Sequence, residues 1–281
     1  MYEKFYHLEA DPFRLSPNTK PIYRHASYIQ AKTYMLYALR RGEGIVLVTG
    51  RPGTGKTALL RDFTNSVKDE HIVTADLVST QLQSADLIRM IAFSFGVDSL
   101  ISDESKIIDE LGARLLGMRD AGRRLLLLID EAQNLENEAL RKIERLMELR
   151  WQSEPLIQIF LIGREPLREL VLAETLKRLY QQVNAVLCLE PLDERGTGEY
   201  IRHRLIQVGW DNDPQLADDI FPVIHTYSHG IPRLINLICS QMLLFGMTEG
   251  LHSIGPDEIN SVLEQMISDQ MLPSPLPHIA V

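Results

Sequence analysis

The stretch that decides the fold of this chain is Gly50-Arg51-Pro52-Gly53-Thr54-Gly55-Lys56-Thr57, which matches the pattern G-x-x-x-x-G-K-[ST] at every fixed position. The apolar run 45–48 leads into it, and residues 58–63 leave it in a helical pattern. This strand–loop–helix order is the context in which the pattern forms a phosphate-binding loop. The alternative is an ordinary glycine-rich turn that happens to contain a lysine, and the flanking strand and helix disfavour it.

In such a loop the glycines allow a tight turn, so that backbone N–H groups face the phosphates with the N-terminus of the next helix behind them. The sequence predicts that Lys56 places its ammonium group near the β- and γ-phosphates and that the Thr57 hydroxyl ligates Mg²⁺. We therefore expect ATP and Mg²⁺ as ligands. The predicted nucleotide-binding residues of this segment are Gly50, Pro52, Gly53, Thr54, Gly55, Lys56, Thr57 and Ala58.

The order of the remaining elements predicts an α/β protein. Helical spacing marks residues 27–41, 83–95 and 104–120, and a further helix contains Leu140, Ile143 and Met147. Apolar runs of strand length alternate with these helices, which favours a mostly parallel sheet with helices on both faces. The five expected strands lie near residues 45–49, 72–76, 125–129, 157–162 and 186–189.

A different pattern begins near Asp193, where helices without a convincing strand are expected at 193–208, 213–227, 232–246 and 256–268. The Pro-rich residues 273–277 predict a disordered tail. We therefore divide the chain into an N-terminal segment with the first helix, a nucleotide-binding α/β domain, a small helical domain and the tail. Their expected bounds are 1–44, 45–192, 193–269 and 270–281.

Composition limits the classes of function. The chain has 281 residues, 45% hydrophobic and 24% charged, which is typical of globular proteins with one or two domains. No apolar run has the length of a membrane span, and the N-terminus lacks the layout of a secretory signal. We expect a cytoplasmic protein. Cys188 and Cys239 lie in apolar stretches without a CxxC motif, so we expect two buried free thiols.

The charge distribution disfavours a nucleic-acid role for the C-terminal third. Residues 193–269 hold 12 acidic residues against 4 arginines and no lysine, although the first 192 residues are nearly neutral. Such an acidic region is a poor platform for a phosphodiester backbone. The first 192 residues are nearly neutral as a whole, and a local basic patch within them is compatible with this balance of charges.

The run Leu125-Leu126-Leu127-Leu128-Ile129-Asp130-Glu131 has the form of a buried strand that ends in two acids, the Walker B pattern. We expect Asp130 to hold Mg²⁺ through water and Glu131 to polarise the water that attacks the γ-phosphate. A strand that ends in acids by chance is the alternative. Arg233 begins a predicted helix from which it could reach the γ-phosphate, although a surface arginine is the simpler interpretation of its position alone.

Together these motifs resemble the AAA+ ATPases of the general secretion pathway protein A (ExeA-type) family, and most closely the shorter subfamily from exosortase (PEP-CTERM) and exopolysaccharide loci. The resemblance spans about residues 1–250. Besides the phosphate loop, the residues that carry it are Met1-Tyr2, Phe5, Leu8, Pro12-Phe13, Ser16-Pro17, Asp130-Glu131-Ala132-Gln133-Asn134-Leu135, Tyr200-Ile201, His203-Arg204-Leu205 and Gly230-Ile231-Pro232-Arg233-Leu234-Ile235-Asn236.

The resemblance implies a P-loop sheet with strand order 5-1-4-3-2, followed by a small helical lid. It implies that Arg233 is the sensor-2 arginine and that Pro12-Phe13 lies near the adenine. It also implies a homo-oligomer with sites at subunit boundaries, and a membrane-anchored partner in protein export or polysaccharide secretion. Longer relatives carry a membrane span and a peptidoglycan-binding region that this chain lacks, so we expect that partner to be a separate protein, with this chain peripheral at the inner membrane.

Two departures from the family pattern affect catalysis. Where the family has G-Q-P-E-L after the fourth strand, this chain has Gly163-Arg164-Glu165-Pro166-Leu167, so Arg164 replaces the sensor-1 polar residue. Where the family has a Gln-Arg pair before the fifth strand, this chain has Gln181-Gln182, so the expected arginine finger is absent. Arg178, one turn earlier, is a candidate substitute, and a solvated surface arginine is the alternative.

Three functions are compatible with the sequence. The first is a slow ATPase whose lid motion serves envelope protein or exopolysaccharide secretion. The second, favoured by Arg164 and Gln182, is a nucleotide-gated switch that holds ATP with little hydrolysis. The third is a DNA-associated regulator of the transposition-ATPase type, which the acidic lid disfavours.

Overall fold

The computed structural model describes residues 1–14, 22–42, 44–68, 71–79, 84–97 and 103–272. The chain divides into two compact units. A helical unit comprises Met1–His25, Gly53–Gly55 and Pro191–Val281, and a sheet unit comprises Ala26–Pro52 and Lys56–Glu190. Of the tail expected at 270–281, residues 273–281 lie outside the described residues, as do the motif residues Ser16-Pro17, whereas Leu272 is buried in the core of the helical unit.

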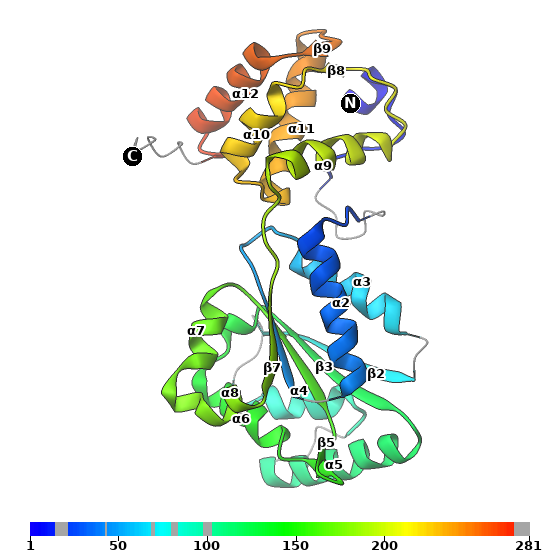
Figure 1. Ribbon diagram of the computed structural model, residues 1–281, viewed down its shortest axis with the longest axis vertical. Helices are drawn as coiled ribbons and strands as arrows, with labels where there is room; N and C mark the ends of the chain where they lie inside the picture. The colour runs from blue at the N-terminus through cyan, green and yellow to red at the C-terminus, as the bar shows by residue number, and fades with distance from the viewer. Residues whose placement is uncertain (15–21, 43, 69–70, 80–83, 98–102, 273–281) are drawn as a thin grey trace. The chain divides into compact units, whose positions relative to one another are not determined.

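A five-stranded parallel sheet forms the centre of the sheet unit (Figure 1). Its order, β2-β3-β6-β1-β7, is the expected order 5-1-4-3-2 read from the other edge, so this prediction is confirmed. In the register, Val48 of β1 pairs with Ile162 of β6 on one side and with Leu187 of β7 on the other. The strands are β1 (Ile45–Thr49), β2 (Ile72–Val78), β3 (Arg124–Asp130), β6 (Gln158–Ile162) and β7 (Val183–Cys188).

Helices cover both faces of this sheet (Figure 1), which explains its continuous apolar strands. On one face Leu47 and Leu127 join a core with Leu111 of a covering helix. On the other face Phe160 packs against Phe63, with ring centroids 5.4 Å apart. The helices are α2 (Ala26–Arg41), α3 (Lys56–Val67), α4 (Leu87–Ser94), α5 (Glu104–Asp120), α6 (Asn137–Leu146), α7 (Pro166–Leu172) and α8 (Lys177–Gln181), with 3₁₀ turns η2 (Ala132–Asn134) and η3 (Glu174–Leu176) and the short hairpin β4 (Arg150–Trp151) and β5 (Glu154–Pro155).

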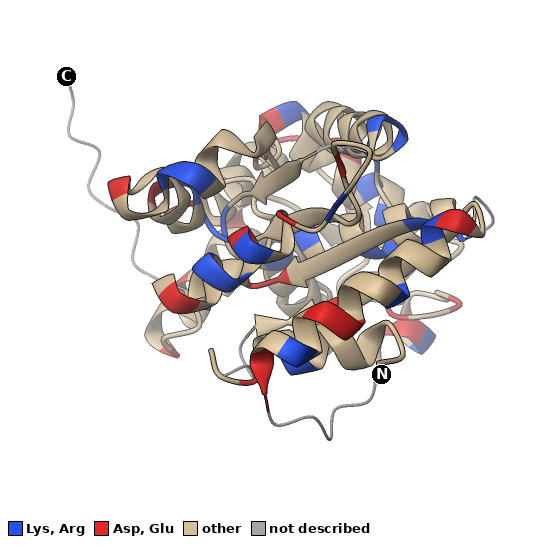
Figure 2. Cartoon of the chain, turned by 90° about the horizontal axis from the view of Figure 1, so that it is seen from below, with Lys and Arg blue, Asp and Glu red and all other residues tan. Residues whose placement is uncertain are grey.

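Charged residues lie mainly on helices and connections, whereas the strands carry few of them (Figure 2). A local basic patch does occur in the sheet unit, where Arg41, Arg119, Arg123 and Arg124 line a hollow of about 280 Å³. Arg124 donates to the carbonyl oxygen of Arg40 (2.8 Å) at the end of α2, and Arg119 is ion-paired with Glu154. Cations near helix C-termini complement the helix dipole, so this patch has a structural explanation.

The helical unit has its own apolar core, built mainly from α9 (Glu194–Ile206), α10 (Ile220–Ser228), α11 (Pro232–Thr248) and α12 (Pro256–Ser268). The expectation of a unit without strands is wrong, because β8 (Gln215–Leu216) pairs in parallel with β9 (Ser253–Ile254). The helix expected from residue 213 begins only at Ile220. The physical reason is Pro214, which disfavours helical geometry before it, while the next N–H, that of Gln215, donates to the carbonyl of His252 (2.8 Å).

The described residues before α2, 1–14 and 22–25, pack within the helical unit. They include the short helix α1 (Tyr2–Phe5) and the fully buried side chains of Tyr6 and Phe13. The Tyr6 hydroxyl donates to the carbonyl of Leu251 (3.1 Å), and Arg204 Nε donates to the carbonyl of Pro12 (2.6 Å). The expected segment 1–44 is therefore shared between the two units, since α2 belongs to the sheet unit.

The two cysteines differ in exposure. Both are free, and Cys239 is buried in α11 as expected, but Cys188 is exposed. The expectation for Cys188 is wrong because β7 is an edge strand in which half-buried and exposed side chains alternate. In the described ranges, no helix is both long and apolar enough to cross a bilayer.

Candidate nucleotide-binding site

The phosphate loop connects β1 to α3 and contains two glycines in backbone conformations that L side chains rarely adopt. Gly53 has φ 86° and Gly55 has φ 103°. At Gly53 a side chain would also collide, because an added Cβ would lie 2.7 Å from the Cβ of Arg233, which belongs to the same compact unit. These glycines allow the tight turn that the motif predicts.

Lys56 begins α3 and is only 7% exposed. Its Nζ donates to the carbonyl oxygens of Gly50 (2.8 Å) and Arg51 (3.0 Å), so the ammonium group lies over the loop. Burial lowers the Lys56 pKa, and the nearby carboxylates of Glu131 and Asp130 partly oppose this shift. A buried ammonium held by two carbonyls is poised to interact with an anion that enters the loop.

Thr57, at the start of α3, and Asp130, at the end of β3, are in contact. The Thr57 hydroxyl donates to Asp130 Oδ2 at 3.0 Å, and Asp130 Oδ1 accepts from the main-chain N–H of Glu131 at 2.8 Å. Asp130 is 7% exposed. A hydroxyl and a carboxylate are hard oxygen donors that suit Mg²⁺, an ion that keeps several waters and is usually bound by one or two carboxylates together with phosphates.

This donor set therefore fits the ion that the sequence predicts. No cluster of three or more His, Cys, Asp or Glu with metal-ligand geometry occurs in the part of the chain that the structure describes. The metal would thus depend on Thr57, Asp130 and the nucleotide's own phosphates.

Glu131 follows Asp130 in the left-handed region, with φ 55°, which is uncommon for a residue other than glycine. Its main-chain oxygen accepts from the Ser79 hydroxyl and from the N–H of Asn134 (2.9 Å). Its carboxylate oxygen Oε2 accepts from Gln133 Nε2 at 2.6 Å. Strained backbone that is held by several hydrogen bonds occurs preferentially at functional sites.

Arg164 and Gln133 complete this cluster. Arg164 Nε lies 3.7 Å from Glu131 Oε2, so the residue that replaces the sensor-1 polar group is ion-paired with the Walker B glutamate. The main-chain N–H of Arg164 donates to Gln133 Oε1 at 2.8 Å. Gln133 is not among the site residues predicted from the sequence. The sequence feature that could have indicated it is its position two residues after Glu131 in the acidic motif.

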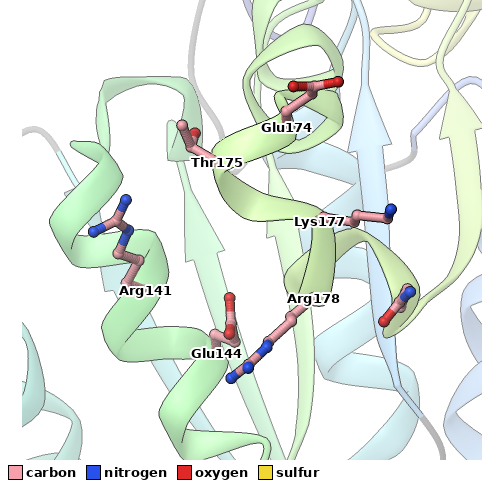
Figure 3. A pocket seen from close by; sticks show the side chains of 7 residues that line it. Arg141, Glu144, Glu174, Thr175, Lys177 and Arg178 are labelled. Atoms are coloured by element: carbon pink, nitrogen blue, oxygen red, sulfur yellow. The ribbon is translucent and has the colours of Figure 1, made fainter.

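Arg178 lies elsewhere on the sheet unit. Its side chain lines a hollow of about 500 Å³ between α6 and the η3–α8 segment, together with Arg141 and Lys177 (Figure 3). Glu144 and Glu174 contribute the acidic side chains. Among the described residues, no hydrogen bond or ion pair joins Arg178 to the phosphate loop or to the acid pair.

Of the pair Gln181-Gln182 at the position of the expected finger, Gln182 has a structural role at the C-terminus of α8. The carbonyl of Gln182 accepts from the N–H of Ile45 (2.7 Å), and its Oε1 accepts from Arg150 (3.4 Å). Arg233 is the exposed second residue of α11, and its main-chain N–H donates to the carbonyl of Gly53 (3.3 Å).

Comparison with known proteins identifies a family and a sequence relative. The profile of the AAA domain family matches residues 39–171. The chain is 33% identical to general secretion pathway protein A from Aeromonas hydrophila over 261 residues, which cover 92% of this chain and 47% of that protein. The chain thus spans about half the length of this relative.

Solved structures share the fold at low sequence identity. The ORC2 protein of Aeropyrum pernix has a TM-score of 0.66 and 15% identity, with 92% of this chain and 72% of that chain covered. Cdc6p of Pyrobaculum aerophilum has a TM-score of 0.66 and 18% identity (90% and 70%), and the RuvB branch migration motor of Thermotoga maritima has 0.53 and 18% (85% and 68%). With the sequence relative from Aeromonas hydrophila and the AAA domain match, the chain belongs to the ExeA-type family of AAA+ P-loop proteins.

Proposed function

We propose that this protein binds Mg·ATP at residues 50–58 and hydrolyses it slowly. The observation that carries the proposal is the 3.0 Å contact between Thr57 and Asp130, which brings the predicted metal ligands of the two motifs together, with Glu131 directly beside them. The family membership supports the same assignment.

Each residue has a distinct role in the proposed reaction. The Lys56 ammonium group gives up its hydrogen bonds to the loop carbonyls and contacts the β- and γ-phosphates instead. Thr57 and Asp130 hold Mg²⁺, which neutralises charge on the phosphates. Glu131 uses Oε1 to orient the attacking water and accept its proton, since Oε2 already accepts from Gln133. Arg164 supplies positive charge beside that carboxylate, Arg178 of a neighbouring copy approaches the γ-phosphate, and Arg233 senses the nucleotide.

Steady-state phosphate release from wild type and Glu131→Gln tests this proposal. Wild type should turn over slowly, and the variant should bind ATP with unchanged affinity and lose about 10²-fold or more in turnover. Glu138→Gln, which changes an exposed glutamate of α6, is the matched control and should behave as wild type. Equal turnover in wild type and Glu131→Gln contradicts the proposed hydrolysis.

A second candidate, a nucleotide-gated switch, is favoured by two observations. Glu131 Oε2 is shared between Gln133 and Arg164, and Gln182 occupies the family's finger position. A switch would bind ATP tightly, show no turnover above Glu131→Gln, and change its protection pattern in hydrogen exchange when ATP is added. Rapid turnover would contradict it.

The cellular role that we propose is that of an accessory motor or regulator in envelope protein or exopolysaccharide secretion, because the relative from Aeromonas hydrophila is a general secretion pathway protein. In this role the protein is cytoplasmic and reaches the inner membrane through a membrane-anchored partner. It assembles as a homo-oligomer, so light scattering with a slowly hydrolysed ATP analogue should show a rise in mass. A strict monomer at high concentration contradicts the assembly.

A further inference from the structure

We propose that Gln133 is a positioning residue for the Walker B glutamate. Its side-chain amide joins the carboxylate of Glu131 to the main chain at Arg164, so that the segment after β6 sets the orientation of the carboxylate. This inference rests on the proposed hydrolysis and assigns to it a residue that belongs to neither the phosphate loop nor the acid pair.

The two ends of one amide group make the connection. Gln133 Nε2 donates to Glu131 Oε2 at 2.6 Å, and Gln133 Oε1 accepts from the N–H of Arg164 at 2.8 Å. A main-chain N–H can only donate and an ionised carboxylate can only accept. The amide therefore has one orientation that satisfies both partners, and a flipped amide would lose both hydrogen bonds.

Gly163 leaves space for this amide, and the backbone beside it has little freedom. At Gly163 an added Cβ would lie 2.5 Å from Gln133 Oε1 and 3.2 Å from the Gln133 nitrogen. The carbonyl of Glu131 is held by Ser79 and by the N–H of Asn134. With the backbone of Glu131 fixed in this way, its carboxylate is oriented by two contacts, of which the hydrogen bond from Gln133 (2.6 Å) is shorter than the ion pair with Arg164 (3.7 Å).

The connection also extends toward the phosphate loop. Arg51 Nε lies 3.7 Å from Glu165 Oε1, and Glu165 is the next residue after Arg164. The ion pair is exposed and contributes little to stability. It nevertheless places the loop, the segment after β6, Gln133 and the Glu131 carboxylate in one continuous series of contacts. A shift of the main chain at Arg164 would thus turn the Gln133 amide and with it the carboxylate.

Two variants separate the two hydrogen bonds. Gln133→Met has a similar length and neither a strong donor nor a strong acceptor, whereas Gln133→Glu, when its new carboxyl group is ionised, keeps the acceptor for the Arg164 N–H and replaces the donor to Glu131 with a like charge. Gln30→Met, the same substitution at an exposed glutamine of α2 in the same unit, is the control. Each protein is measured by amide hydrogen exchange without nucleotide and by steady-state phosphate release.

We expect the Arg164 amide to exchange about tenfold faster in Gln133→Met and at the wild-type rate in Gln133→Glu. Both variants should lose about tenfold or more in kcat with little change in KM. They change the orientation of the Glu131 carboxylate and leave the contacts with the phosphates intact. In a Glu131→Gln background, Gln133→Met should cause no further loss, since the two residues act as one unit.

Unchanged exchange at Arg164 in Gln133→Met overturns the proposed connection, and so does a further loss of turnover in the Glu131→Gln background. Wild-type turnover in Gln133→Glu overturns the positioning role. If wild type itself shows no turnover, the proposed hydrolysis fails separately, and the exchange comparison still decides whether Gln133 carries the connection.

Discussion

The hydroxyl of Thr57 lies 3.0 Å from Oδ2 of Asp130, although 73 residues separate them in the sequence. Thr57 is at the start of α3, directly after the loop that follows β1, and Asp130 ends β3. The strands β1 and β3 both run parallel to β6, which lies between them. Their carboxyl ends therefore lie at the same edge of the sheet. Ligands of open α/β sheets bind at this edge.

The contact predicts a metal-dependent effect of Asp130→Asn. An amide in place of the carboxylate removes a negative charge that faces Mg²⁺, so the affinity for the ion should fall about 10–100-fold. Titration of Mg²⁺ into protein with a slowly hydrolysed ATP analogue measures this change. Asp109→Asn, at an exposed position of α5, is the control. Equal Mg²⁺ dependence in wild type and Asp130→Asn would contradict the assigned ligand.

Lys56→Ala should weaken ATP binding about 10–100-fold, since hydrogen bonds to charged groups contribute about 1.5–3 kcal/mol each. Isothermal calorimetry measures the dissociation constant directly. Lys106→Ala, at an exposed lysine of α5, should bind as wild type does. Full affinity in Lys56→Ala would show that the ammonium group does not contact the nucleotide.

Gly163→Ala tests the Gln133 connection from the opposite side. The new Cβ would push Gln133 Oε1 away and would also crowd Leu167 Cδ2 (3.0 Å) and the main-chain nitrogen of Gln133 (3.2 Å), so the cost in stability should be about 1–3 kcal/mol. Turnover should nevertheless fall as it does in Gln133→Met. Denaturant midpoints and phosphate release measure the two effects.

Gly117→Ala in α5 is the matched control, because no atom lies within 4 Å of the Cβ it would add. It should stabilise the protein by about 0.5–1 kcal/mol, since glycine is a poor helix former, and leave turnover unchanged. Wild-type turnover in Gly163→Ala would argue against a role for the Gln133 amide.

Arg178 should act between subunits. Arg178→Ala alone should lose about 10³-fold in turnover, the smaller end of the range for finger arginines, and Arg168→Ala on α7 should not. Mixed oligomers of Arg178→Ala and Glu131→Gln should regain activity, because some sites then combine an intact Glu131 with an intact neighbouring Arg178. Absence of recovery in mixtures that assemble, as judged by light scattering, identifies Arg178 as a solvated surface residue.

Cys188 should react slowly with thiol reagents despite its exposure. Partial burial, with the adjacent Glu190 carboxylate, raises the pKa of its thiol to about 11. Because only the thiolate reacts, alkylation by iodoacetamide at pH 8 should be about 100-fold slower than for a thiol with an unshifted pKa of about 9. The rate should rise about tenfold per pH unit until the pH approaches 11. Rapid labelling at neutral pH, lost in Cys188→Ser, would contradict the raised pKa.

Much of the fold could be predicted because the signals are local. The apolar run before Asp130 predicts a buried strand, and the spacing from Glu104 to Asp120 predicts a helix whose bounds the structure reproduces. The failures involve contacts between residues far apart in the sequence. Leu216 pairs with Ile254, a two-residue contact without a pattern of its own, and the exposure of Cys188 follows from the edge position of its strand.

The sequence by itself determined the phosphate loop, the acid pair and the alternation of strands and helices, because each is encoded by residues close together in the chain. Only the tertiary structure decided that Gln133 bridges Glu131 and Arg164 and that residues 1–14 pack with the helical unit. These arrangements depend on which segments the sheet and the core bring within hydrogen-bonding distance. Such distances follow from packing of the whole chain, and no short pattern contains them.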